Sequence, residues 1–235
     1  MNDLITDFLK LRESAYTWGA VLLHGLVHAQ SSLTLFIACS DGRVPPELVM
    51  KSEPGGMFVI RNAGNIVPYC ESEPGGVSGT VEYVVAALHV KDMVICSHSD
   101  CGAMTAIAKS HDRSQAPAVS SWQRNADAAR TVNAAHDHGS EQDKVDDLVR
   151  QNVIAQLNNL RNHPSVALAL SQTALRLHGW VFDLESGEII ALDHLSGDFV
   201  NLNENPNTYA YAGQAVTAAG GRLAAAVYTP NHLTY

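Results

Sequence analysis

The stretch Leu33-Thr-Leu-Phe-Ile-Ala38 is a continuous apolar run that stops at the polar cluster Cys39-Ser-Asp-Gly-Arg43. Further along the chain, Asp92-Met-Val-Ile-Cys-Ser97 has the same character and stops at His98-Ser-Asp-Cys101. Short apolar runs without polar alternation are typical of strands that are buried on both faces. The two stretches therefore predict two core strands, each followed by side chains that can bind a metal.

The segment between these two strands indicates the topology of the sheet. A third apolar run, Met57-Phe-Val-Ile60, ends in Arg61-Asn-Ala-Gly-Asn65. It is followed by apolar residues at helical spacing, namely Val81, Val84, Val85 and Leu88. A strand, a helix and a further strand in succession favour a parallel sheet that is covered by helices. We therefore expect an α/β fold with a mostly parallel sheet flanked by helices.

The C-terminal half predicts two packing helices and a hairpin. Apolar residues at helical spacing between residues 145 and 160 indicate an amphipathic helix, and Pro164 can open a second, short helix that ends near Ser171. Residues 175–183 and 188–193 alternate on either side of a turn that contains glycine. This pattern predicts an antiparallel hairpin at the edge of the sheet.

We interpret residues 1–204 as a single domain of this α/β type. Within it, residues 1–32 are expected to form an N-terminal helical arm ahead of the first strand. From residue 205 the composition shifts to Asn, Thr, Tyr, Ala and Gly with little periodicity. Residues 205–235 are therefore expected to form a low-complexity C-terminal tail or arm.

Composition and charge exclude several classes of protein. The chain has 235 residues, of which 46% are hydrophobic and 17% are charged, so we do not expect a disordered protein. Its formal net charge of −9 repels phosphate groups, which argues against a nucleic-acid partner. The first residues lack the Lys or Arg of a signal peptide. The apolar stretch 20–27 is too short to cross a bilayer. Four cysteines are too few for a disulfide framework. We expect a cytoplasmic protein without membrane association.

Potential metal ligands follow two separate predicted strands: Cys39 and Asp41 after the first, His98 and Cys101 after the other. In open parallel sheets the ligand crevice lies at the carboxyl ends of the strands, so these residues can meet in space. Two thiolates and one imidazole suit Zn²⁺, and three protein ligands leave the fourth tetrahedral position open. The pattern predicts a catalytic zinc centre made by Cys39, His98 and Cys101.

The remaining candidate ligands are interpreted as structural. Cys70 and Cys96 are expected to behave as small apolar residues of the core. His136 and His138 lie in a polar stretch that is typical of solvated surface.

Asp41 and Arg43 lie two residues apart and can form an ion pair. On a protein surface, this would be an ordinary salt bridge. Next to a zinc ion, the same pair would decide whether the carboxylate takes the fourth metal position or stays back to accept a hydrogen bond.

Four motifs occur together in this chain: Cys39-Ser-Asp-Gly-Arg-Val44, Phe58-Val-Ile-Arg-Asn-Ala-Gly-Asn65, Gly79-Thr-Val-Glu-Tyr83 and His98-Ser-Asp-Cys-Gly-Ala103. In this order and spacing they resemble the β-class carbonic anhydrases, and the bacterial and cyanobacterial members most closely. The resemblance spans residues 1–203. It implies reversible hydration of carbon dioxide to bicarbonate and a proton.

The resemblance also implies roles for individual residues. One Zn²⁺ per chain would be held by Cys39, His98 and Cys101, while Asp41 would alternate between the metal and Arg43. A substrate pocket would be formed by Gln30, Phe58 and Tyr83. Because the family takes this Gln from the neighbouring subunit, a homodimer or homotetramer is implied.

The chain departs from the family pattern at three positions. The family usually has Ser at the position of Gly42 and Gly at that of Ser97. Gly42 removes a hydroxyl group from the surroundings of the Asp41–Arg43 pair, which could reduce turnover. Phe36 stands where one subgroup has the Trp of a regulatory bicarbonate pocket, which favours a form without that pocket.

Two other functions stay open at this point. A zinc hydroxide would also attack carbonyl sulfide or carbon disulfide, so a hydrolase of such a CO₂-like molecule is an alternative. Gly42 and the unusual C-terminal tail also fit a catalytically silent zinc-binding protein that serves in interaction or sensing.

Overall fold

The computed structural model describes residues 5–7, 9–10, 32–70, 75–112 and 114–212. Its centre is a seven-stranded sheet with the order β2-β1-β3-β4-β5-β6, in which β7 also pairs with β4. The strands are β1 (Thr34–Cys39), β2 (Phe58–Asn62), β3 (Asp92–His98), β4 (Arg176–Phe182), β5 (Ile189–Leu192), β6 (Phe199–Asn201) and β7 (Tyr211–Ala212).

The sheet is parallel at its centre and antiparallel at one edge. Strands β2, β1, β3 and β4 run in the same direction, whereas β5, β6 and β7 pair in the antiparallel sense. The predicted mostly parallel sheet and its C-terminal antiparallel hairpin are confirmed. The strand β6 and the short strand β7 were not expected from the sequence.

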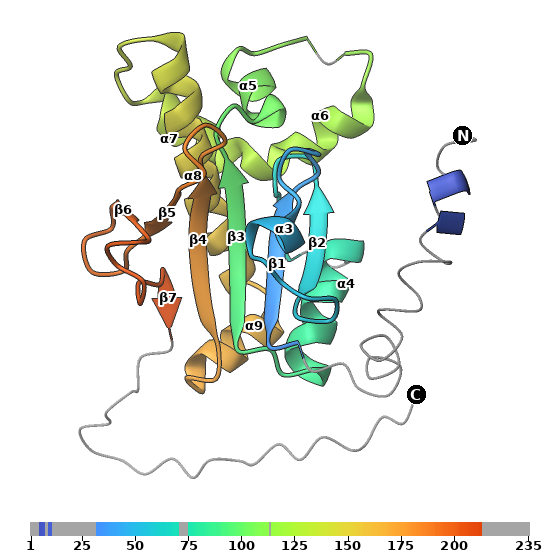
Figure 1. The fold of residues 1–235 in the computed structure, drawn as a ribbon. Helices are drawn as coiled ribbons and strands as arrows, with labels where there is room; N and C mark the ends of the chain where they lie inside the picture. The colour runs from blue at the N-terminus through green and yellow to red at the C-terminus, as the bar shows by residue number, and fades with distance from the viewer. Residues whose placement is uncertain (1–4, 8, 11–31, 71–74, 113, 213–235) are drawn as a thin grey trace, which may run out of the picture.

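Helices connect the strands, and most of those packed on the sheet cover one of its faces (Figure 1). They are α3 (Pro46–Val49), α4 (Gly76–Glu82), the π-helical turn η1 (Tyr83–Ala87), α5 (Gly102–Ala108), α6 (Pro117–Gln123), the 3-10 turn η2 (Arg124–Ala126), α7 (Asp127–Ala134), α8 (Glu141–Arg161) and α9 (Pro164–Ser171). Figure 1 shows α4, α8 and α9 behind the sheet, α3 in front of it, and α5, α6 and α7 at the end to which the parallel strands point.

The apolar strands are continuous because they are buried on both faces. In β1, Leu35 and Ile37 belong to the main core under α8, whereas Phe36 and Ala38 belong to a smaller cluster on the opposite face. This alternation follows from the two-residue period of a strand. Cys39 continues the first set, so its side chain lies on the face covered by α8.

The helix α8 forms because its apolar residues recur at helical spacing and its first turn is capped. The side-chain hydroxyl of Ser140 accepts a hydrogen bond from the backbone N–H of Asp143, and two acidic residues, Glu141 and Asp143, lie in the first turn. Both features stabilise a helix N-terminus. The short helix expected between Pro164 and Ser171 is present with those bounds.

The fold continues beyond residue 204, where we expected the domain to end. Strand β7 pairs with β4, and the N–H of Ala210 donates to the carbonyl of Leu177 at 2.9 Å. Residues 205–212 are therefore part of the sheet assembly, because their backbone groups find partners there. Residues 213–235 and most of the proposed arm 1–32 lie outside the described residues. Across the described part of the chain, no helix is both long and apolar enough to span a membrane.

Candidate metal centre

Three potential metal ligands meet at the carboxyl ends of two neighbouring strands. Cys39 is the last residue of β1, His98 is the last residue of β3, and Cys101 directly precedes α5. The sulfur atoms of the two cysteines are 4.0 Å apart. A ring nitrogen of His98 and both sulfurs lie within 4.8 Å of one another, and all three residues are buried. The structure thus brings together the three residues that the sequence singles out.

The ring of His98 is oriented so that one nitrogen faces this cluster. Its Nδ1 lies 2.8 Å from the carbonyl oxygen of Ser99, which can only accept, so Nδ1 carries the proton. The other nitrogen, Nε2, is buried and has no hydrogen-bond partner among the described residues. A buried nitrogen lone pair without a partner is costly unless a metal or donor binds it. The hydrogen bond to Ser99 is of the kind that orients histidine ligands.

The two thiols favour a shared proton. The hydrogen bond from Cys101 lowers the pKa of Cys39 to about 4, although burial opposes this shift. The same hydrogen bond, together with burial, raises the pKa of Cys101. A dication would displace the remaining proton, because the thiolate is the form of cysteine that binds metals. Two sulfurs and one nitrogen at this spacing fit a zinc ion with one open position.

The sulfur of Cys39 accepts a further hydrogen bond from the backbone. The N–H of Gly64 points to it at 3.4 Å. The same peptide unit has its carbonyl on Ala63, which accepts from the indole N–H of Trp122 at 3.0 Å. Trp122 lies on α6, so that helix holds the peptide that donates to the thiolate.

The turn that carries Gly64 is anchored by amide side chains of α8. Asn152 donates to the carbonyl of Gly64 at 3.0 Å, the oxygen of Gln156 accepts from the N–H of Val67 at 2.9 Å, and Asn159 donates to the carbonyl of Val67 at 2.9 Å. Asn152 and Gln156 are fully buried. Because they satisfy backbone groups that the sheet leaves unpaired, the turn is fixed against the main core.

Asp41 lies just outside the cluster of three ligands. Its Oδ2 atom is 3.9 Å from Nε2 of His98. Arg43 binds both carboxylate oxygens: Nε lies 3.0 Å from Oδ1 and Nη2 lies 2.7 Å from Oδ2. The backbone N–H of Arg43 also donates to Oδ1, at 2.9 Å. The expected ion pair is present, and the carboxylate is turned towards Arg43.

These contacts fix the ionisation of the pair. The hydrogen bonds from Arg43 hold the pKa of Asp41 well below its ordinary value. In return, the carboxylate of Asp41 and then that of Asp100 raise the pKa of Arg43. Asp41 is therefore a carboxylate at neutral pH and can only accept hydrogen bonds. Arg61, on β2, supports the same loop by donating to the carbonyls of Cys39 and Asp41 at 3.1 and 2.6 Å.

Comparisons with known proteins agree with this geometry. The family model described as carbonic anhydrase matches residues 34–189. A carbonic anhydrase of Pseudomonas aeruginosa is 55% identical over 91% of this chain and 97% of its own length. The chain is a β-class carbonic anhydrase.

Further relatives support this assignment. Carbonic anhydrase 1 of Escherichia coli O157:H7 is 53% identical over 93% of this chain and its entire length. The solved structure of the β-carbonic anhydrase CcaA is 36% identical, has a TM-score of 0.83, and covers 90% of this chain and 95% of its own. A tetrameric β-carbonic anhydrase of Sordaria macrospora is 28% identical with a TM-score of 0.68, and the match covers 85% of this chain and 95% of that one. Hydration of carbon dioxide is the general activity of the carbonic anhydrase family.

Phe58, one of the predicted pocket residues of this carbonic anhydrase, lies away from the metal cluster of its own chain. Phe58 opens β2, and the same strand reaches the level of Cys39 only at Asn62, four residues later. That offset is about 13 Å along the strand. Tyr83 follows α4 and is 50% exposed. Gln30 lies outside the described residues.

Of the positions that depart from the family pattern, Gly42 and Ser97 lie close to the ligands along the chain, whereas Phe36 lies on the other face of the sheet. A side chain at Gly42 would meet no atom within 4 Å, so the loop has room for the more usual serine. Ser97 is fully buried, and its hydroxyl has no partner among the described residues. Phe36 is buried on the sheet face opposite α8, at 6.0 Å from the ring of Trp180.

Cys96, His136 and His138 lie outside the metal cluster. Cys96 is buried among apolar side chains, as expected. His136 is half exposed and hydrogen-bonds Asp147 at 3.0 Å, whereas His138 has an exposed fraction of only 14% and contacts the carbonyl of Asn133 at 3.0 Å. Most of the stretch that we interpreted as solvated surface is exposed, and His138 is half-buried in the turn between α7 and α8.

Sequence reasoning missed several residues that hold the site. Asp100 contacts Arg43, Trp122 contacts the Ala63 carbonyl, and Asn152 and Gln156 are buried under the sheet. We predicted α8 from its apolar residues alone, and Asn152 and Gln156 belong to this helix. Their spacing of four residues within the apolar stripe is the signal that could have revealed them.

Proposed function

We propose that this chain is a zinc enzyme that catalyses the reversible hydration of carbon dioxide to bicarbonate and a proton. Cys39, His98 and Cys101 would hold one zinc ion per chain. The observation that carries the proposal is the buried Nε2 of His98, which has no partner among the described residues and lies beside two thiol sulfurs. The proposed reaction follows from family membership, and the proposed metal follows from the two sulfur donors and one nitrogen donor.

Zinc bound to these ligands would supply a hydroxide nucleophile at neutral pH, because it lowers the pKa of a coordinated water to about 7. The chain's own residues determine what surrounds that nucleophile. Arg43 keeps both oxygens of Asp41 occupied, so the carboxylate stays away from the fourth metal position. Asp41 remains ionised and close by, at 3.9 Å from Nε2 of His98, where it can accept a hydrogen bond from the nucleophile and orient it.

We further propose that the active unit is a homodimer or a homotetramer. Gln30, Phe58 and Tyr83 would line the substrate pocket, and Phe58 lies about 13 Å along its strand from the level of Cys39 in its own chain. A second copy would supply them. One further observation supports assembly: the solved relative from Sordaria macrospora is tetrameric.

A cytoplasmic location is part of the proposal. The sulfurs of Cys39 and Cys101 are 4.0 Å apart and are both needed as thiolates. Oxidation to a disulfide would remove two ligands at once, so the site depends on a reducing compartment.

Replacement of one ligand tests the proposed function. In Cys39→Ser, we expect loss of zinc and loss of CO₂ hydration, because a serine hydroxyl is not ionised at neutral pH. The control is Cys70→Ser, which removes a thiol that is partly exposed and outside the cluster. Zinc per chain and stopped-flow hydration are measured for both. Full zinc content and full turnover in Cys39→Ser would contradict the proposal.

The same preparation separates the alternatives. Sulfide release from carbonyl sulfide or carbon disulfide, with no hydration of CO₂, would instead assign a hydrolase. Full zinc occupancy with hydration no faster than in buffer would indicate a silent binding protein. Recovery of activity in Gly42→Ser would then trace that silence to the missing hydroxyl.

A further inference from the structure

Arg43 is bound by two carboxylates, not by one. Besides its contacts with Asp41, its Nη1 atom donates to Oδ2 of Asp100 at 2.8 Å, and its Nη2 atom donates to the backbone carbonyl of Asp100 at 3.0 Å. Asp100 lies between His98 and Cys101, on the loop that follows β3. Arg43 lies on the loop that follows β1. The guanidinium group therefore connects the two loops that carry the potential metal ligands.

We propose that Asp100 is a positioning residue for the Asp41–Arg43 pair, an inference that rests on the proposed zinc site. By fixing one edge of the guanidinium group, Asp100 holds Arg43 in place while the other edge binds Asp41. Without the carboxylate of Asp100, Arg43 would keep only its contacts with Asp41 and one hydrogen bond to the backbone carbonyl of Asp100. The side chains of Arg43 and Asp41 could then move together, and the carboxylate of Asp41 could reach the fourth metal position.

The backbone at Asp100 is shaped for this contact. Its φ angle is +53°, in the left-handed region that aspartate, asparagine and glycine tolerate better than other residues. This conformation directs both the carboxylate and the carbonyl of Asp100 to the same guanidinium group. Glycine or asparagine can keep the backbone turn, so the contribution of the side chain can be separated from that of the turn.

Two effects of removing the carboxylate oppose each other. Loss of a directional contact frees the guanidinium group, whereas loss of a negative charge strengthens the attraction between Arg43 and Asp41. The side chain of Asp100 is 70% exposed, so water and salt screen its charge strongly. The hydrogen bond from Nη1 of Arg43 to Oδ2 of Asp100 fixes the orientation of the planar guanidinium group, and screening does not remove this directional effect. We therefore expect the loss of position to dominate.

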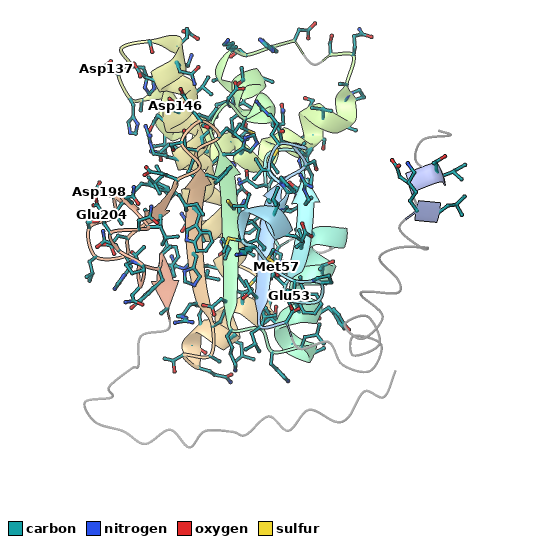
Figure 2. All side chains as sticks on the ribbon, in the orientation of Figure 1. Glu53, Met57, Asp137, Asp146, Asp198 and Glu204 are labelled. Atoms are coloured by element: carbon teal, nitrogen blue, oxygen red, sulfur yellow. The ribbon has the colours of Figure 1, made fainter. Side chains whose placement is uncertain are left out.

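The test uses the zinc-loaded and cobalt-loaded forms of Asp100→Gly and Asp100→Asn. The affinity of azide for the fourth metal position, read from the cobalt absorption spectrum, should fall about three- to fivefold in Asp100→Gly. The value of kcat/KM for CO₂ should fall by a similar factor, with metal content unchanged. Asp100→Asn keeps one acceptor oxygen and should fall between wild type and Asp100→Gly. Asp198→Asn, in the exposed hairpin between β5 and β6 (Figure 2), is the control for a lost negative charge.

A double-mutant cycle identifies the route of the effect. In an Arg43→Gln background, Asp100→Gly should leave azide affinity unchanged, because the group that it positions is gone. An equal loss of affinity with and without Arg43, or no loss in Asp100→Gly, would overturn the proposal. Wild-type hydration is measured alongside: an inactive wild type would contradict the proposed function, whereas an active wild type with an unaffected variant would contradict only the role of Asp100.

Discussion

The backbone nitrogen of Gly64 lies 3.4 Å from the sulfur of Cys39 and donates a hydrogen bond to it. The carbonyl of the same peptide unit, on Ala63, accepts from the indole of Trp122. A hydrogen bond to the carbonyl polarises a peptide and strengthens its N–H as a donor. The charge on the Cys39 thiolate is thus stabilised by a peptide that a helix far along the chain holds in place.

Gly64→Ala should destabilise the fold and also weaken metal binding. Gly64 has a φ angle of +83°, and a Cβ atom there would lie 2.8 Å from Cε of Met104 and 3.2 Å from Cβ of Ala103. The left-handed backbone alone costs about 1–2 kcal/mol for alanine. The additional crowding should shift the peptide away from Cys39. We expect a lower free energy of unfolding and a lower zinc affinity, measured by competition with a chromophoric chelator.

Gly187→Ala is the matched control for this variant. Its φ angle is +73°, but a Cβ atom there would meet nothing within 4 Å. It should therefore lose only the free energy of unfolding that the left-handed backbone costs, with no change in zinc affinity. Equal zinc affinities for the two variants would show that the Gly64 peptide does not tune the site.

Asn152→Leu should destabilise the protein by about 2 kcal/mol or more, although it makes the buried face of α8 more apolar. Asn152 is fully buried and donates to the carbonyl of Gly64, which would be left without this partner. An unsatisfied buried polar group costs about 1–3 kcal/mol. Denaturant unfolding measures the change. The same substitution at Asn158, which is exposed on the same helix, should change stability by less than about 0.5 kcal/mol.

Asp92 should contribute stability that disappears in acid. Its carboxylate accepts from Nε of Arg176 and Nε2 of His178, each at 2.8 Å, which ties the start of β3 to the start of β4. Burial alone would raise the pKa of Asp92, but these two partners lower it below its ordinary value of 3.8. Because the folded-state pKa is the lower one, the stabilisation is present above about pH 4 and is lost as the pH falls through the folded-state value.

Asp92→Asn should therefore lose about 1–2 kcal/mol of unfolding free energy at pH 7. The difference from wild type should shrink as the pH falls below about 4. Urea unfolding at a series of pH values measures this dependence, with the exposed Asp198→Asn as reference. A difference that stays constant down to pH 3 would show that the ionised carboxylate is not the source of the stabilisation.

The end of the domain can be tested by truncation. A chain that ends at Glu204 would lose the backbone bond from Ala210 to Leu177, the 2.7 Å contact between Thr208 and Asp193, and the packing of Arg161 against the Tyr211 ring. We expect its Tm to fall by about 4–8 °C. The reference is a chain that ends at Ala212, which keeps all three contacts. If the shorter chain were equally stable, residues 205–212 would belong to the tail that the composition suggests.

The amino-acid pattern was enough to predict the central parallel strands and the three potential ligands. Apolar runs such as residues 33–38 bury both faces of a strand, and they end where polar residues begin. Because parallel strands end at one edge of the sheet, Cys39 and His98 could be assigned to one site without knowledge of the intervening chain. The helices α8 and α9 were likewise predicted from local features, namely apolar residues at helical spacing in α8 and the proline at the start of α9. Both helices are present as expected.

The surroundings of those ligands depend on how distant parts of the chain fold together. The contact between Asp100 and Arg43 depends on a left-handed residue in one loop and a guanidinium in another, and no short-range pattern encodes that pairing. The buried amide of Asn152 has a partner only because a turn 88 residues earlier presents an unpaired carbonyl there. Secondary structure follows from the spacing of neighbours along the chain. Hydrogen bonds between distant segments depend instead on how the sheet and α8 pack, and that packing is a property of the whole fold.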